Sequence, residues 1–164
     1  MSLPINFELP TTNNSYYKLE TGKNQLQPVS DFEIGYQYFT DEGKPVKQRT
    51  PFEKTPTDIG KAKDGTQNKI QFFIACLVWN PNTGTIELWQ VTQKTIIKAI
   101  HDLETTKGWE NTMDYALNIT KTGEGLTTEY SILPSQPTPQ TPEMIEAMKH
   151  NTIDIAKWFD GELV

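Results

Sequence analysis

The sequence contains one cysteine, two histidines and one arginine among its 164 residues, and these scarcities exclude several kinds of protein. Cys76 alone cannot form an internal disulfide, so a disulfide-stapled scaffold is excluded. Cys76, His101 and His150 supply too few ligands for a zinc site built from the chain itself. We therefore expect no metal and no cofactor.

Long apolar runs are also missing. No stretch approaches the ~18 consecutive apolar residues that a membrane-spanning helix needs. Residues 1–6 lack the basic region and apolar core of a secretory signal. Hydrophobic residues make up 35% of the chain and aromatic residues 10%, which is sufficient for a folded core. We therefore expect one folded domain with no membrane association.

The net charge of −6 argues against nucleic-acid binding, because a polyphosphate needs neutralising cations. The charge is unevenly distributed, however. Residues 44–69 hold seven of the 15 lysine and arginine residues against three acids, a net charge of +4, and the segments on either side are acidic. This basic segment indicates either a polyanion-binding surface or a solvated, lysine-rich loop.

The first half of the chain has the pattern of β-structure. Residues 25–39 predict a long strand with a bend, and residues 40–68 predict a polar connection. Residues 69–79 and 85–91 predict a hairpin, because five turn residues ending in Gly84 join two β-rich runs. Even positions from Ile70 to Val78 are uniformly apolar and are expected to face the core. The odd positions are mixed, so that face is expected to be less buried.

The second half predicts one helix, a second hairpin and a helical tail. Apolar residues at helical spacing predict a helix over 93–106 with Thr92 as its N-cap. Alternation predicts strands over 114–121 and 126–133. A Pro-rich stretch then leads to a C-terminal helical tail over 142–159.

Five strands with one helix between the third and fourth follow the order of an OB-fold, a mainly β, five-stranded barrel. A five-stranded α+β sheet with its helix on one face is the alternative. We divide the chain into an irregular N-terminal arm (1–15), an OB-fold domain (16–134), a Pro-rich linker (135–142) and a C-terminal helical tail (143–164).

No group of residues has the pattern of a catalytic site. His101 lies beside Asp102 on the predicted helix and is expected to be a solvated histidine. Glu124 and Glu129 flank a predicted hairpin and are expected to be surface charges rather than an acid–base pair. We therefore expect no enzymatic activity and no catalytic residue.

Aromatic residues next to the basic segment indicate binding of single-stranded nucleic acid. Bases stack on flat side chains for ~1–3 kcal/mol each while cations follow the phosphates. The expected phosphate contacts are Lys44, Lys47, Arg49, Lys54 and Lys69, and the expected stacking surfaces are Tyr36, Tyr38, Phe73, Trp79 and Trp89. Burial in the core is the alternative for these aromatics; it weighs most on Tyr36 and Trp89 and least on Phe73 and Trp79.

Several stretches resemble the OB-fold single-stranded DNA-binding proteins of tailed bacteriophages and their prophage relatives. They are residues 17–24, 34–39, 43–46, 73–80, 86–96 and 121–130, which occur in the order of the family's strands, basic loop, helix start and last hairpin. The resemblance implies non-sequence-specific binding and protection of single-stranded DNA in phage DNA replication, recombination or repair. It also implies a cytoplasmic location in the bacterial host and no enzymatic activity.

Two departures from this family concern the basic loop and the tail. Arg49 is the only arginine where such loops are often arginine-rich, and the chain ends with few acids and an apolar finish. The resemblance implies phage or host replication proteins as partners of the tail, and it is compatible with a homodimer. A different class remains open, an OB-like module that binds a protein or an oligosaccharide and has no nucleic-acid role. A nuclease on the same barrel would need clustered acids, and none is apparent.

Overall fold

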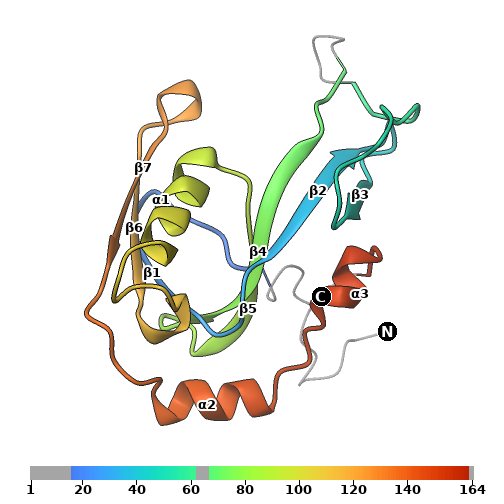
Figure 1. The fold of residues 1–164 in the computed structure, drawn as a ribbon. Coiled ribbons are helices and arrows are strands. Elements are labelled where there is room, and N and C mark those ends of the chain that lie inside the picture. Colours follow the sequence, from blue (N-terminus) through green and yellow to red (C-terminus); the bar gives the residue numbers. More distant parts are fainter. Residues whose placement is uncertain (1–15, 62–66, 163–164) are drawn as a thin grey trace, which may run out of the picture.

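The computed structural model describes residues 16–61 and 67–162, so the predicted arm over 1–15 lies outside the described residues. The described part is mainly β, with three α-helices (Figure 1). The strands are β1 (Gly22–Pro28), β2 (Glu33–Phe39), β3 (Pro45–Gln48), β4 (Gln71–Asn80), β5 (Thr85–Val91), β6 (Leu117–Thr122) and β7 (Glu129–Pro134). The helices are α1 (Lys94–Glu104), α2 (Pro142–Lys149) and α3 (Ile155–Phe159), with short 3₁₀ turns at Thr112–Asp114 and Gly125–Thr127.

The strands form an open antiparallel sheet that is organised around β4. One edge of β4 pairs first with β2 and then with β1, and its other edge pairs with β5. The path continues from β1 to β6 and β7, while β3 pairs with the far edge of β2. Seven described strands replace the five that were predicted. The bend splits the first predicted strand into β1 and β2, and β3 forms inside the segment predicted as a polar connection.

The bend between β1 and β2 keeps the chain against β4. The Val29 amide donates to the Leu77 carbonyl at 2.9 Å, and the Leu77 amide donates to the Ser30 hydroxyl oxygen at 2.9 Å. These bonds bind the corner to the middle of β4, so β1 and β2 leave it in different directions. The expected long, bent first strand is therefore present as two strands joined at a fixed corner.

The main core lies between the sheet and α1. Ile74, Cys76 and Val78 of β4 are buried there together with Ile96 and Ile100 of α1, as their spacing predicts. The same expectation is wrong for Ile70 and Phe72, which are 37% and 38% exposed. Phe72 lines an open pocket together with Ile97 of α1 and meets the Tyr36 ring, so this end of the even face is only partly covered.

Local helix signals are only partly correct. The predicted helix over 93–106 is α1, but its N-cap is Gln93 rather than Thr92, and no side chain caps it. The predicted tail helix is interrupted and becomes α2 and α3. Each begins at a capping side chain, with Thr141 accepting from the Met144 amide and Asp154 accepting from the Ala156 and Lys157 amides. No helix within residues 16–61 and 67–162 is long and apolar enough to cross a membrane.

Candidate nucleic-acid interface

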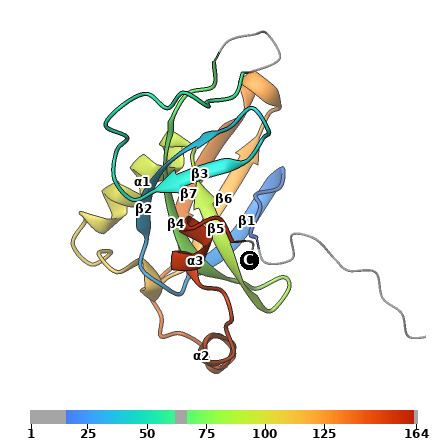
Figure 2. The same cartoon turned by 90° about the vertical axis from the view of Figure 1, so that its right-hand side faces the viewer.

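A second apolar cluster lies on the opposite side of the sheet from α1. Its floor consists of Phe73, Ala75 and Leu77 from the odd positions of β4 and Leu88 from β5, and we call these four residues the covered face. Figure 2 looks onto this side of the molecule, where α3 lies in front of β4 and β5. The expectation that the odd positions of β4 are less buried is therefore wrong, because the C-terminal segment packs on them.

Two adjacent aromatic side chains of α3 make the main contact with the covered face. The Phe159 ring stacks on the Phe73 ring with their centroids 5.7 Å apart and their planes at 28°. The Trp158 ring meets the Phe73 ring edge to face, with centroids 5.6 Å apart. Phe73 is fully buried, and Trp158 is 2% exposed. The expectation that Phe73 is an exposed stacking surface is therefore wrong, because this chain's own rings cover it.

Two of the predicted cations lie over these same rings. The Lys47 ammonium is 4.5 Å from the centroid of the Trp158 ring, and the Arg49 guanidinium carbon is 4.2 Å from the centroid of the Phe159 ring. Contacts of this kind contribute about 0.5–2 kcal/mol each, more where water is excluded. Burial lowers the pKa of Lys47. Each α3 ring therefore packs against Phe73 and also has a cation over it.

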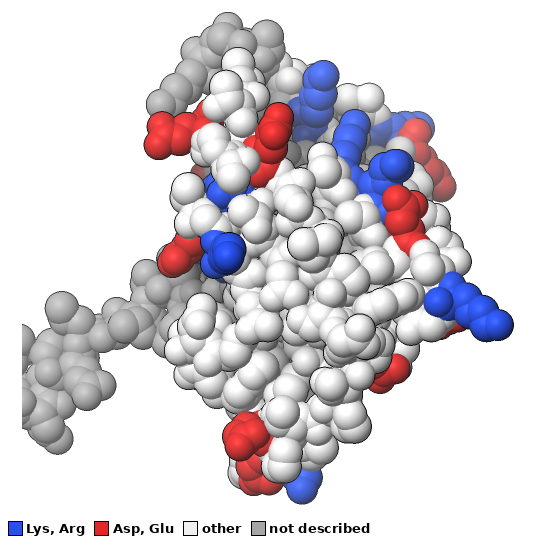
Figure 3. Space-filling view, turned by 90° about the vertical axis from the view of Figure 1, so that its left-hand side faces the viewer, with Lys and Arg blue, Asp and Glu red and all other residues white. Residues whose placement is uncertain are grey.

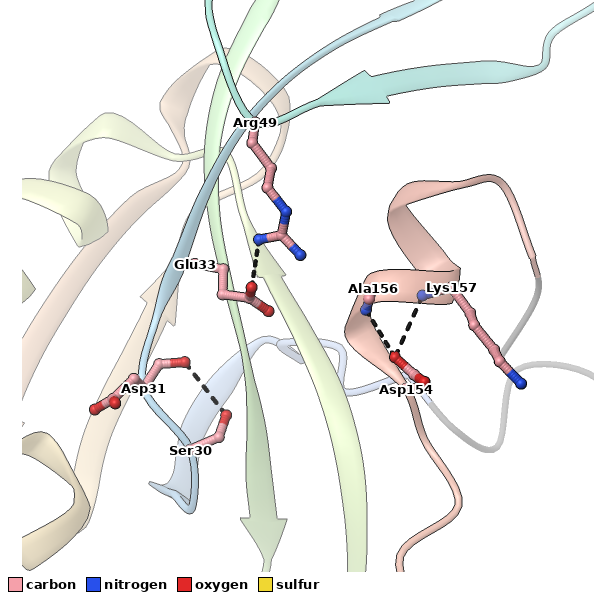
Figure 4. A network of polar contacts seen from close by, with 7 residues as sticks. All are labelled: Ser30, Asp31, Glu33, Arg49, Asp154, Ala156 and Lys157. Atoms are coloured by element: carbon pink, nitrogen blue, oxygen red, sulfur yellow. Dashed lines mark hydrogen bonds and ion pairs between the residues drawn. The ribbon is translucent and has the colours of Figure 1, made fainter.

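An acidic group holds Arg49 in this position. Arg49 forms an ion pair with Glu33 at the start of β2, as Figure 4 shows. In the same view Asp154 caps the first turn of α3, accepting from the Ala156 amide at 2.9 Å and the Lys157 amide at 3.3 Å. Among the described residues, no ion pair joins α3 to the sheet. Packing and cation–π contact therefore hold α3, with its own cap supporting the helix.

A chain of three glutamine amides lies on the same side of the sheet. Gln37 of β2 donates through Nε2 to Gln71 Oε1 at 2.9 Å, and Gln90 of β5 donates through Nε2 to Gln37 Oε1 at 2.8 Å. Gln37 is 4% exposed and pairs across the strands with Lys47, one of the two cations. These three residues could not be predicted as part of a site, because isolated glutamines in a β-rich pattern carry no functional signal.

Predicted aromatics on the other face are arranged differently. Tyr36 is half-buried and meets the Phe72 ring at 5.4 Å between centroids, in an edge-to-face geometry. Beside this pair lies a pocket of about 360 Å³ between β2, β4 and α1, lined by Phe32, Ile34, Phe72, Ile74, Ile97, Ile100, His101 and Glu104. Tyr36 is thus accessible but lies on the opposite side of the sheet from Phe73 and Lys47.

Two further predicted stacking residues, Tyr38 and Trp89, are buried like Phe73, so the expectation that they form stacking surfaces is wrong. Tyr38 packs against Phe52, and its hydroxyl donates to Asp58 Oδ1 at 2.8 Å. Trp89 is 2% exposed and packs in the main core against Tyr17 and Phe32. Both residues follow the strand alternation that points their side chains away from the covered face.

The remaining predicted residues lie away from the contact between Phe73 and α3. Trp79 is half-buried at the far end of β4 and packs against the cluster beneath α2 and α3. Lys44, Lys54 and Lys69 are exposed, and Lys44 lies 3.6 Å from the Glu42 carboxylate. Of the ten predicted site residues, the structure places Lys47, Arg49 and Phe73 around the two aromatic rings of α3, with Trp79 along the same face.

The side of the molecule formed by β6 and β7 carries described charges of both signs. Figure 3 shows the side of β6 and β7, where charged side chains of both signs lie around the margin of a broad uncharged area. Within the described ranges, no group of three or more His, Cys, Asp or Glu side chains is placed to hold a metal ion. A comparison with family models, with curated proteins and with solved structures finds no match to this chain.

Proposed function

We propose that this chain binds single-stranded DNA without sequence specificity on the covered face, after α3 leaves it. The observation that carries the proposal is that each α3 ring contacts both Phe73 and a cation, with Lys47 over Trp158 and Arg49 over Phe159. Stacked bases and their phosphates need the same groups, a flat apolar floor and cations beside it. The protective role in phage DNA replication, recombination or repair follows from the resemblance of the sequence.

The strand order supports a finer proposal for the fold. We take β1 and β2 as one bent first strand, β4 and β5 as the second and third, and β6 and β7 as the fourth and fifth, with α1 between the third and fourth. This is the order of an OB-fold, with β3 added to the loop after the first strand. In that fold the second and third strands carry the ligand, and here they form the covered face.

DNA can bind the covered face only if its binding energy exceeds the cost of displacing α3. Truncating a buried Phe or Trp to Ala costs about 3–5 kcal/mol, so the α3 rings compete strongly with a ligand for the same floor. A single strand offers several bases, at ~1–3 kcal/mol for each stacked base, together with phosphates for Lys47 and Arg49. Binding therefore requires several nucleotides at once, and short ligands are expected to bind weakly.

The test measures anisotropy of a labelled oligo-dT at two salt concentrations. The Trp158→Ala/Phe159→Ala variant should bind more tightly than the unsubstituted chain, because the competing rings are gone. In that background, Lys47→Gln/Arg49→Gln should weaken binding and lower its salt dependence. Lys107→Gln, an exposed lysine after α1, serves as the matched control and should change neither. Absence of salt-sensitive binding in both the unsubstituted chain and the ring variant would refute the proposal.

A second candidate function is the binding of a helical peptide, because the segment that now covers the face is itself a short helix. The covered face holds a short helix with two adjacent aromatic residues, which is also how a groove binds an amphipathic helical peptide. In that case the face binds a helix of a partner protein and has no nucleic-acid role. An α3-derived peptide would then compete with the partner at all salt concentrations, and oligo-dT would not displace α3.

A further inference from the structure

The chain of amides through Gln71, Gln37 and Gln90 has an unusual position for a structural contact. The three residues come from β4, β2 and β5, and they lie on the side of the sheet that carries Phe73. Gln37 is buried at the centre of the chain, Gln90 is half-buried and Gln71 is exposed. The row of amides is therefore buried at its centre and more accessible at both ends.

The two ends of the amide chain have opposite hydrogen-bonding character. Both side-chain amide atoms of Gln37 are used, because its Nε2 donates to Gln71 and its Oε1 accepts from Gln90. Within the described residues, Gln71 Nε2 and Gln90 Oε1 have no further partner. The row of amides thus offers a donor group, Nε2, at the Gln71 end and an acceptor group, Oε1, at the Gln90 end.

The donor end and the acceptor end of the amide chain exchange if all three amides turn together. A glutamine amide exchanges its oxygen and nitrogen by a half-turn about its last bond. If all three amides turn together, both internal hydrogen bonds are kept, while Gln71 becomes the acceptor and Gln90 the donor. One amide cannot turn alone without placing two donors or two acceptors against each other, which costs about 1–3 kcal/mol in a buried site. The three amides therefore have two arrangements that keep both internal hydrogen bonds.

The amide chain is also next to a phosphate-binding candidate. Lys47 of β3 is the cross-strand partner of Gln37, and paired strands are about 5 Å apart. A phosphate bound at Lys47 would place its own nucleotide over the neighbouring strands, where Gln37 and Phe73 lie. The amide chain is thus within reach of the polar edge of a base whose face stacks on the aromatic floor.

We propose that Gln71, Gln37 and Gln90 form a polarity-switching contact to the edges of the bases of bound single-stranded DNA. This inference rests on the proposed function and names how that site accommodates different bases. The Watson–Crick edge of every base, which a single strand leaves accessible, carries both donors and acceptors in different orders. A contact that exchanges its donor and acceptor ends can serve each of them, which gives hydrogen bonding without sequence preference.

Glutamate substitutions test the switch, because a carboxylate can only accept. In Gln71→Glu or Gln90→Glu, the neighbouring amides must all donate toward the carboxylate, so both ends of the chain become acceptors. Affinities for oligo-dT, oligo-dC and oligo-dA are compared within each variant. The ratio of two affinities in one variant cancels the uniform repulsion between the added charge and the phosphates. Gln71→Met and Gln90→Met are the uncharged controls.

The unsubstituted chain should bind the three oligonucleotides with similar affinities. Both glutamate variants should shift preference from oligo-dT toward oligo-dC and oligo-dA, whose amino groups donate, by about threefold to tenfold. The methionine controls should weaken all three by about twofold to tenfold, because a hydrogen bond is lost without a new polarity. A purely structural amide chain would leave the affinity ratios unchanged.

The results distinguish failure of the amide switch from failure of DNA binding, the function on which this inference rests. Unchanged ratios in glutamate variants that still bind DNA in a salt-dependent way would overturn the inference and leave the proposed function intact. A shift in Gln71→Glu without a shift in Gln90→Glu would overturn the coupled switch, because only one end would then contact the bases. Absence of salt-sensitive binding by both the unsubstituted chain and the Trp158→Ala/Phe159→Ala variant would overturn both.

Discussion

The ring of Phe73 lies directly over the backbone of Gly35, its partner across the β2–β4 pair, so closely that a Cβ at position 35 would overlap the ring. Gly35 is therefore required by the packing of this ring. Because Phe73 in turn carries Trp158 and Phe159, the position of α3 depends on the absence of a side chain on β2.

Gly35→Ala is expected to destabilise the protein by about 1–3 kcal/mol, because the added methyl group forces the Phe73 ring out of its place. The free energy of unfolding in urea measures this cost. Phe73→Leu combined with Gly35→Ala provides the control, since a smaller side chain makes room for the methyl group. The double variant should cost less than the sum of the two single variants, and strict additivity would contradict this packing.

Asp154→Ala is expected to weaken α3 selectively. Its carboxylate accepts from two amides of the first turn, and loss of such a cap costs about 0.5–2 kcal/mol. Amide hydrogen exchange should therefore accelerate in residues 155–159 and stay unchanged in β6 and β7. Asp154→Asn keeps an acceptor and should exchange nearly as slowly as the unsubstituted chain. Equal acceleration in both variants would show that the cap does not hold α3.

Glu33→Gln is expected to strengthen binding of oligo-dT. Glu33 now pairs with Arg49, so its carboxylate competes with a phosphate for the same guanidinium. Removing this charge should raise the affinity at low salt by about twofold to fivefold, the range of an exposed ion pair. Glu129→Gln, an exposed acid on β7, is the matched control and should have little effect. An equal increase in both variants would indicate a change in net charge rather than release of Arg49.

Glu87→Gln is expected to stabilise the protein in a pH-dependent way. Burial raises the pKa of Glu87 above its ordinary value of 4.5, while the hydrogen bond from Asn80 lowers it by less. The folded chain therefore binds this proton more tightly than the unfolded chain, so stability falls as pH rises from 4.5 through the raised pKa. Above that pKa the cost of the buried carboxylate is fully present.

Glutamine keeps the hydrogen bond from Asn80 and carries no charge. The free energies of unfolding of Glu87→Gln and the unsubstituted chain should therefore be similar below pH 4.5, and the variant should become the more stable protein at pH 7. Urea unfolding at several pH values measures this difference. A difference that stays constant across this range, or that favours the unsubstituted chain as pH rises, would contradict the account.

Much of the sheet could be predicted from local sequence, because its signals are local. Alternation and the turn ending at Gly84 predicted the β4–β5 hairpin, and helical spacing predicted α1. The position of Lys47 beside Gln37 could not be predicted, because it depends on the pairing of β3 with β2. β3 was missed because Pro45 and polar residues give a four-residue edge strand no apolar pattern.

The occupant of the site could not be predicted in the same way. The contact of Phe73 with Trp158 and Phe159 joins segments far apart in the chain, and no local pattern encodes it. One signal was present: Phe73, Ala75 and Leu77 make the odd face of β4 too apolar for a solvated surface. An apolar tail with adjacent Trp and Phe was the segment available to cover it.

The indole N–H signal of Trp158, followed by NMR during titration with oligo-dT, tests directly whether DNA displaces α3 from the covered face. Trp158 is buried and has the Lys47 ammonium over its ring, whereas Trp109 packs against Tyr115 on the other side of the sheet and serves as the internal reference. If DNA displaces α3, the chemical shift of the Trp158 indole should move to that of a solvent-exposed indole, and the Trp109 signal should stay in place. Saturating, salt-sensitive binding with an unchanged Trp158 signal would contradict displacement of α3.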